Sequence, residues 1–143
     1  MNIYMDIDGV IIGVRSPRSD VVDLLRFIME HYADSAYWLT THCRGGENRC
    51  AQWLKRNGFP DALVAEMDAV FKPTDWDVLK TEAIDFSRPF VWLDDAPFQS
   101  EMAVLARHGA ADSCIVMDKR DPQMARRALT RLTGLRDAEA AGR

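Results

Sequence analysis

The chain has 143 residues, of which 48% are hydrophobic and 28% are charged, and it carries a formal net charge of −4 at pH 7. This composition is typical of a globular domain with its own core, and the acidic balance argues against a protein that mainly coats nucleic acid. No apolar stretch approaches the roughly 20 residues of a membrane span, and no leader segment is visible, so we expect no membrane partner. Three cysteines at unrelated spacings, Cys43, Cys50 and Cys114, do not form a disulfide framework, which favours a cytoplasmic protein.

The first sixty residues alternate between strand and helix patterns. Residues 3–7 form an apolar run that predicts a strand, and residues 21–32 then place apolar side chains at helical spacing. A second apolar run, residues 36–40, predicts another strand. Residues 48–57 return to helical spacing, and the glycine and proline that follow are typical of a helix end.

The rest of the chain continues this alternation. We expect helices over residues 75–85 and 97–107 and a last helix from Asp121 onward. Three further apolar runs predict strands, namely residues 62–65, 90–93 and 114–117. The pattern as a whole is that of an α/β fold, here with five parallel strands and helices on both faces of the sheet. We expect one domain over residues 1–135, followed by a frayed tail over residues 136–143.

Two aspartates close the first apolar run. Asp6 and Asp8 stand one residue apart and are followed at once by Gly9. Because side chains alternate faces along a strand, the two carboxylates point to the same side. Two like charges so close disfavour each other's ionisation unless a cation lies beside them, and an oxygen-rich site suits Mg²⁺. The alternative is an Asp-rich turn without a ligand, since Asp and Gly are common turn residues.

Polar residues also end two other predicted strands. Thr40 and Thr41 come at the end of the second strand, and Asp94 and Asp95 at the end of the fourth. Strands joined by crossover helices run parallel, so their carboxyl ends gather at one edge of the sheet, where ligands of open α/β sheets bind. Four aspartates that converge there would repel one another strongly without a metal ion. The sequence therefore predicts a cation site at this edge.

Four motifs in a fixed order carry a resemblance to a known family. They are the segments YMDIDGV and YWLTTH, a helix that begins near Lys80, and the segment VWLDD. Over residues 1–118 the chain thereby resembles the haloacid dehalogenase superfamily of phosphatases and phosphotransferases. The resemblance implies a three-layer Rossmann-like fold and a Mg²⁺-dependent phosphatase, a hydrolase of phosphoric monoesters that works through an aspartyl-phosphate intermediate.

The resemblance also assigns roles to the aspartates. Asp6 would be the nucleophile that takes the phosphoryl group. Asp8 would act as the general acid that protonates the leaving oxygen and then as the base that activates water. The Mg²⁺ ligands would be the Asp6 carboxylate, the main-chain carbonyl of Asp8 and Asp94, while Asp95 would hold a metal-bound water or the lysine.

A threonine and a lysine are expected to hold the substrate phosphate, because phosphoryl transfer depends mainly on positioning and charge stabilisation. Thr40 and Thr41 are adjacent, and we favour Thr40 because it directly follows the apolar run. Lys80 and Lys72 both precede the fourth strand, and we favour Lys80 because a helix-sized gap separates it from Asp94. The member of each pair that does not bind phosphate is expected to be a surface residue.

The substrate is expected to be a phosphorylated small molecule, a nucleotide or a nucleic-acid end. Only short segments follow the first and second motifs, so the chain resembles the superfamily's members that have no cap domain or a minimal one, whose open sites accompany large substrates or a lid from a partner subunit. The segment TTH followed by QWLK is also similar to small deoxynucleotidases. No obligatory protein partner is evident. The rival hypothesis is a non-catalytic binding or regulatory module that keeps the metal site without turnover.

Several other residues allow two interpretations. Arg44 either contacts the substrate phosphate or is a solvated loop arginine, since its planar guanidinium suits both places. A zinc site or a nucleophilic cysteine made from His42, Cys43 and Cys50 is disfavoured, because no second pair has the spacing of a zinc site. The tryptophans are expected to be core residues first; they are Trp38, Trp53, Trp76 and Trp92.

Overall fold

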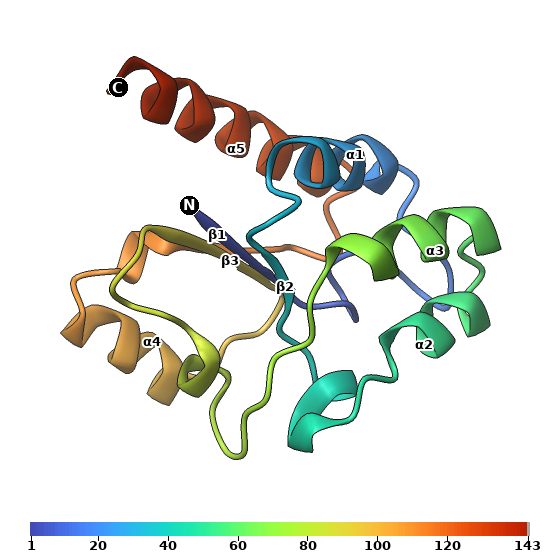
Figure 1. Ribbon diagram of the computed structural model, residues 1–143, viewed down its shortest axis with the longest axis horizontal. Coiled ribbons are helices and arrows are strands. Elements are labelled where there is room, and N and C mark those ends of the chain that lie inside the picture. Colours follow the sequence, from blue (N-terminus) through green and yellow to red (C-terminus); the bar gives the residue numbers. More distant parts are fainter. Residues whose placement is uncertain (143) are drawn as a thin grey trace.

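A computed structural model describes residues 1–142 and contains one parallel sheet with the strand order β2-β1-β3-β4 (Figure 1). The strands are β1 (Asn2–Met5), β2 (Ala36–Trp38), β3 (Phe90–Asp94) and β4 (Cys114–Val116). The α-helices are α1 (Val21–His31), α2 (Cys50–Arg56), α3 (Asp61–Val70), α4 (Gln99–Arg107) and α5 (Met124–Ala141). Three short 3-10 turns complete the chain, namely η1 (Thr41–Gly46), η2 (Lys80–Ala83) and η3 (Ala111–Ser113).

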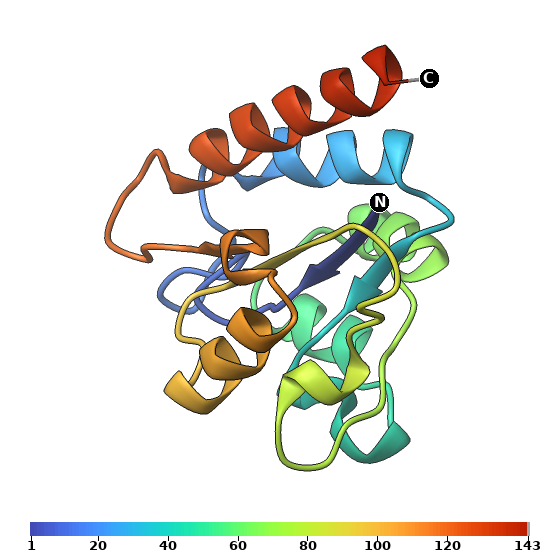
Figure 2. The same cartoon turned by 90° about the vertical axis from the view of Figure 1, so that its left-hand side faces the viewer.

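Helices cover both faces of the sheet, which confirms the expected α/β architecture. Ile3 and Met5 point to one face, where they join a core built with α1, α2, α3 and α5, and Tyr4 points to the other face, which is covered by α4 and the segment before β3. This split follows from the alternation of side chains along a strand. Figure 2 shows α1 and α5 side by side on the first face. Both faces of the sheet are therefore buried, as parallel sheets require.

The prediction of a fifth strand is wrong, because residues 62–65 lie inside α3. The buried side chains of this helix are Leu63, Val64 and Met67, which share one helical face. Alanine, leucine, glutamate and methionine are strong helix formers, and Pro60 stands directly before the first turn. Apolar runs of four residues occur both in short strands and in buried helices, so a run of this length does not distinguish a strand from a helix.

The prediction of a helix over residues 75–85 is also wrong, because the segment has no regular structure apart from the single turn η2. The carboxylate of Glu82 accepts hydrogen bonds from the backbone N–H groups just ahead of that turn, those of Asp77, Val78 and Leu79, at 3.1, 3.0 and 2.7 Å. The side chain thereby replaces the backbone acceptors that a regular helix would have supplied. Trp76 is nevertheless buried as expected.

The C-terminal segment differs from the frayed tail expected from residue 136 onward, since α5 continues to Ala141. Glu139 accounts for the difference. Its carboxylate lies 3.2 Å from the amino group of Met1 and 3.3 Å from the hydroxyl of Tyr32. The last turns of α5 are therefore tied to the start of β1 and to the end of α1. Among residues 1–142, neither α5 nor any other helix is long and apolar enough to cross a membrane.

Candidate functional site

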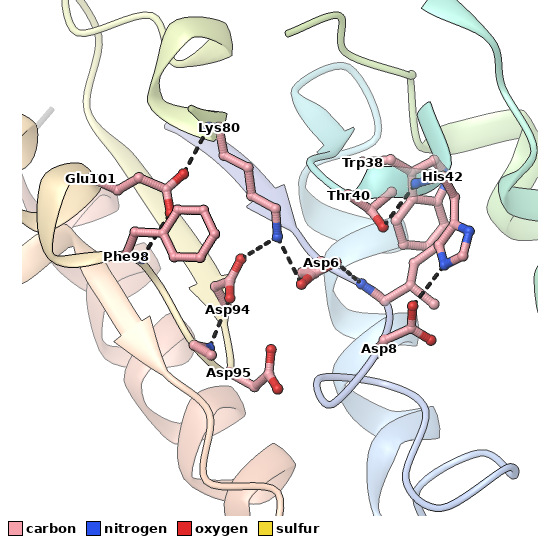
Figure 3. Close-up of polar contacts among 12 residues, drawn as sticks. Asp6, Asp8, Trp38, Thr40, His42, Lys80, Asp94, Asp95, Phe98 and Glu101 are labelled. Atoms are coloured by element: carbon pink, nitrogen blue, oxygen red, sulfur yellow. Dashed lines mark hydrogen bonds and ion pairs between the residues drawn. The ribbon is translucent and has the colours of Figure 1, made fainter. Parts of the chain in front are cut away.

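The candidate site lies where β1 and β3 end at the same edge of the sheet (Figure 3). Asp6 directly follows β1, and its backbone N–H donates a 3.0 Å hydrogen bond to the carbonyl of Leu93. Asp94 is the last residue of β3. The parallel register of the two strands therefore brings the carboxylates of Asp6 and Asp94 together, although 88 positions separate them in the sequence.

Lys80 lies between these two carboxylates. Its Nζ donates to Oδ2 of Asp6 at 2.9 Å and to Oδ2 of Asp94 at 2.6 Å. The other oxygen of each carboxylate accepts a backbone N–H, from Ile7 at 2.7 Å for Asp6 and from Ala96 at 2.9 Å for Asp94. Both carboxylates are buried, so these contacts fix their orientation.

Burial and neighbouring charges shift the pKa values of Asp6 and Lys80. Burial raises the pKa of Asp6 from its usual 3.8 to about 7, with Lys80 opposing that rise and Asp94 adding to it. Burial by itself lowers the pKa of Lys80, because it disfavours the charged ammonium. The carboxylates of Asp6 and Asp94 outweigh this effect and raise the pKa above its usual value. The lysine therefore stays positively charged at neutral pH, whereas Asp6 needs a further positive charge nearby to be fully ionised.

Asp95 completes an acidic cluster with Asp6 and Asp94. One carboxylate oxygen from each residue lies within 4.8 Å of the others, the one such group of three among residues 1–142. Gly9 permits this approach, because a Cβ on it would lie 2.3 Å from Oδ2 of Asp95 and its φ is +76°. Hard carboxylate oxygens at this spacing fit Mg²⁺, and the cation would supply the charge that Asp6 lacks.

The carboxylate of Asp8 is outside this cluster, because both of its oxygens are engaged elsewhere. His42 Nε2 lies 2.7 Å from Oδ2, and Trp53 Nε1 donates to Oδ1 at 2.8 Å. The two rings stack with their centroids 4.7 Å apart. The Asp8 side chain therefore faces α2, which leaves its main-chain carbonyl as the group that the family resemblance assigns to the ion. Trp53 was expected in the core, but it is only half-buried and forms part of the site.

The structure separates the two threonines and the two lysines that the sequence left as alternatives. Thr40 is buried at the end of β2, and in the view of Figure 3 Asp6 lies between it and Asp94. Thr41 is exposed. The backbone of Lys72 pairs with Tyr37 of β2, and its side chain extends toward the start of that strand, away from the acidic edge, where Nζ donates to the carbonyl of Asp34 at 3.0 Å. Thr40 and Lys80 are thus the members of each pair that lie at the acidic edge.

Glu101 is a residue of the site that the sequence did not reveal. It is buried at the start of α4, and its carboxylate accepts the backbone N–H of Lys80 at 2.7 Å and that of Phe98 at 2.9 Å. This one side chain therefore caps α4 and fixes the segment that carries the lysine. The sequence could have predicted the cap, because a glutamate at the third position of a helix is a common capping signal. It could not have predicted the hydrogen bond to Lys80, because that contact is tertiary.

The remaining candidates lie outside the acidic cluster of Asp6, Asp94 and Asp95. The guanidinium of Arg44 lies over the ring of Trp76, 5.1 Å from its centroid. Cys43 and Cys50 are free, buried thiols, and the Cys43 Sγ donates to the carbonyl of Thr40 at 3.3 Å. His42 contacts Asp8 rather than a cysteine. Among residues 1–142 the group of three possible metal ligands does not include His42, Cys43 or Cys50, so these positions form no zinc site. Hydrogen bonds, first of all with Cys50, lower the pKa of the Cys43 thiol to about 5, but that side chain is fully buried.

Comparisons of the chain with protein-family models, with curated proteins and with solved structures each returned no match.

Proposed function

We propose that this protein is a Mg²⁺-dependent phosphatase that hydrolyses phosphate monoesters through an aspartyl phosphate on Asp6. The observation that carries the proposal is the arrangement of three carboxylates, Asp6, Asp94 and Asp95, within 4.8 Å of one another, with Lys80 bound to two of them. Such a concentration of buried acid costs folding free energy. It fits a site that combines a cation with a carboxylate nucleophile, and the motif order resembles the haloacid dehalogenase superfamily.

The chain's own residues supply the groups that both half-reactions need. In the first, an oxygen of Asp6 attacks phosphorus, the bond from phosphorus to the ester oxygen breaks, and Asp8 gives a proton to the departing alcohol. In the second, Asp8 takes a proton from water, the water oxygen bonds to phosphorus, and Asp6 is released together with inorganic phosphate. The sum is the addition of one water to a phosphate monoester, with both aspartates regenerated.

Lys80 and Thr40 complete the phosphate site in this proposal. The ammonium of Lys80 and the hydroxyl of Thr40 would hold the phosphoryl oxygens in line with Asp6. Asp6, Asp94 and Asp95 are the residues that would hold Mg²⁺, which when bound shields the nucleophile from the negative charge of the substrate and stabilises the transferring group. His42 and Trp53 keep Asp8 in one orientation through their hydrogen bonds.

Hydrolysis of an aryl phosphate tests the proposal. The wild-type protein is expected to release inorganic phosphate from p-nitrophenyl phosphate only when Mg²⁺ is present. Asp6→Asn keeps the size of the side chain but removes the nucleophilic oxygen, so kcat is expected to fall by roughly a thousandfold or more. Colorimetric release of p-nitrophenol measures both.

Folding of the variant is checked by circular dichroism, which separates a lost nucleophile from a lost fold. If the wild type shows no Mg²⁺-dependent turnover on this substrate or on a panel of phosphorylated metabolites and nucleotides, the catalytic proposal is wrong. If Asp6→Asn turns over at the wild-type rate, the aspartyl-phosphate route is wrong.

A further inference from the structure

A pocket of about 360 Å³ lies next to the acidic site and plays no part in the chemistry described so far. This volume is in the range of sites for small organic ligands. The pocket, called here the Trp53 pocket, is formed by η1 and α2. It is lined by Thr41, His42, Arg49, Gln52, Trp53 and Arg56.

The Trp53 pocket begins at the residues that hold Asp8. His42 and Trp53, which bind the two oxygens of Asp8, also form its aromatic wall. Thr41 is the next residue after Thr40, the proposed phosphate ligand. In the proposed reaction Asp8 protonates the oxygen of the leaving alcohol, so the group attached to that oxygen lies on the Asp8 side of the reacting phosphorus. The Trp53 pocket adjoins the Asp8 carboxylate through His42 and Trp53. A second pocket is lined by Asp8 itself, but its Lys119 is already paired with Asp95 at 3.6 Å.

The charge of the Trp53 pocket is positive, in contrast to the acidic cluster beside it. Arg49 and Arg56 line it, and no carboxylate does. Arg49 makes an exposed ion pair with Glu47, 3.1 Å away at the rim, and such exposed pairs are weak enough for a stronger anion to replace. One arginine guanidinium can bind two oxygens of a phosphate at once, because its N–H donors form a planar fork.

We propose that the Trp53 pocket binds the leaving group of the substrate and that this leaving group carries a second phosphate. Arg49 and Arg56 would hold that phosphate, while His42 and Trp53 contact the ring or sugar that connects it to the reacting ester. The inference rests on the proposed phosphatase function and narrows its substrate class to phosphate monoesters whose alcohol is itself phosphorylated.

Binding to the Asp6→Asn protein tests the inference without turnover. Isothermal titration in the presence of Mg²⁺ compares adenosine 3′,5′-bisphosphate with adenosine 5′-monophosphate and 3′-monophosphate, which differ from it only by one phosphate. The bisphosphate is expected to bind at least about tenfold more tightly than either monophosphate. In Arg49→Gln/Arg56→Gln, combined with Asp6→Asn, this advantage is expected to fall below about threefold. Equal affinity for the three ligands, or an advantage that survives in the double arginine variant, would overturn the inference.

A matched charge change on the other side of Asp8 serves as the control. Lys119 and Arg120 line a separate pocket together with Asp8 and Asp95. In Lys119→Gln/Arg120→Gln, again combined with Asp6→Asn, the advantage of the bisphosphate is expected to persist. If it disappears there and persists in the arginine variant, the second phosphate binds in that other pocket and the proposal is wrong.

The source of the second phosphate and the outcome for catalysis are read from two further measurements. A 5′-phosphorylated dinucleotide carries a phosphodiester in place of the second monoester; a similar gain in affinity assigns the pocket to a nucleic-acid end, and a gain for the bisphosphate alone assigns it to a small bisphosphate. In the wild type, the ratio of kcat/KM for bisphosphate to monophosphate is expected to follow the ratio of affinities. If the wild type turns over none of these substrates, p-nitrophenyl phosphate included, while the bisphosphate still binds more tightly than the monophosphates, only the phosphatase proposal is overturned.

Discussion

At the scale of single residues, the charge state of Asp6 is the property on which the proposed chemistry depends. A nucleophilic carboxylate has to be ionised, yet burial raises its pKa from 3.8 to about 7. A raised pKa means that the folded state favours the protonated form. The contribution of Asp6 to the free energy of unfolding is therefore fully present below pH 3.8 and is lost as the pH rises through about 7. Above that pH the cation-free protein holds an under-compensated buried charge.

Mg²⁺ binding is consequently expected to depend on pH. The ion and the proton compete for Asp6, so the apparent dissociation constant for Mg²⁺ should rise about tenfold for each pH unit below 7. Thermal unfolding measures this, because saturating Mg²⁺ should raise the melting temperature much more at pH 8 than at pH 5.5. Asp6→Asn is the control and should lose the pH dependence. A Mg²⁺ effect that is the same at both pH values would contradict the assigned role of burial.

The two candidate lysines provide the second prediction at this scale. Lys80→Met removes the charge that contacts Asp6 and Asp94, and kcat/KM is expected to fall by roughly a hundredfold or more. Lys72→Met removes an exposed ammonium that binds only the carbonyl of Asp34 and lies over the ring of Tyr37. Turnover of Lys72→Met should stay within about twofold of wild type. Steady-state assays at constant Mg²⁺ compare the two, and the reverse pattern would overturn the assignment of Lys80.

At the scale of elements, the site depends on how η2 and α4 are joined. η2 is one turn long, and a turn of that length does not fix a side chain by itself. Glu101 supplies the missing constraint, because it binds the backbone of Lys80 and caps α4 with the same carboxylate. Packing between elements, rather than local helix propensity, therefore determines where the ammonium of Lys80 lies.

Glu101→Ala is expected to affect both stability and turnover. It leaves the partly buried N–H groups of Lys80 and Phe98 without their carboxylate acceptor, which should lower the free energy of unfolding by about 1–2 kcal/mol. At a temperature well below the melting point, kcat/KM should still fall by about tenfold, because Lys80 is no longer held in place. Glu82→Ala is the matched control, since Glu82 is exposed and caps the same turn without contacting Lys80. Chemical denaturation and steady-state kinetics measure the two effects, and equal kinetics in both variants would contradict this role for Glu101.

At the scale of the whole molecule, the start of β1 and the last turns of α5 are in contact. The ion pair between the Met1 amino group and Glu139 and the hydrogen bond from Tyr32 to Glu139 connect the start of β1 to the last turns of α5. The acidic edge lies at the other end of β1, after Met5. The Glu139 contacts, which stabilise the fold, and the acidic edge, where the proposed chemistry takes place, therefore lie at opposite ends of β1.

Removal of residues 136–143 tests that separation. The truncated chain is expected to lose about 1–2 kcal/mol in free energy of unfolding, because it lacks the Glu139 contacts, and its melting temperature should drop by a few degrees. Turnover of p-nitrophenyl phosphate below the melting point should remain at the wild-type level. Unchanged stability would instead support the frayed tail that the composition predicts.

The sequence by itself determined the α/β class, four of the strands, and the edge at which Asp6, Asp94 and Asp95 meet. These features depend on the period of apolar side chains and on the rule that parallel strands end together, and both are local or topological properties. It misassigned residues 62–65 and 75–85 because a short apolar run and a side-chain-capped turn carry no distinctive period.

Only the tertiary structure showed that the two aspartates of the first motif have different side-chain partners. Asp6 is buried against Lys80, whereas Asp8 turns to His42 and Trp53. It also placed the ammonium of Lys80, and not that of Lys72, at the acidic edge. The physical reason is the same in each case: side-chain orientation and charge compensation are set by groups that lie 14 to 74 positions away in the chain, and no local pattern records such contacts.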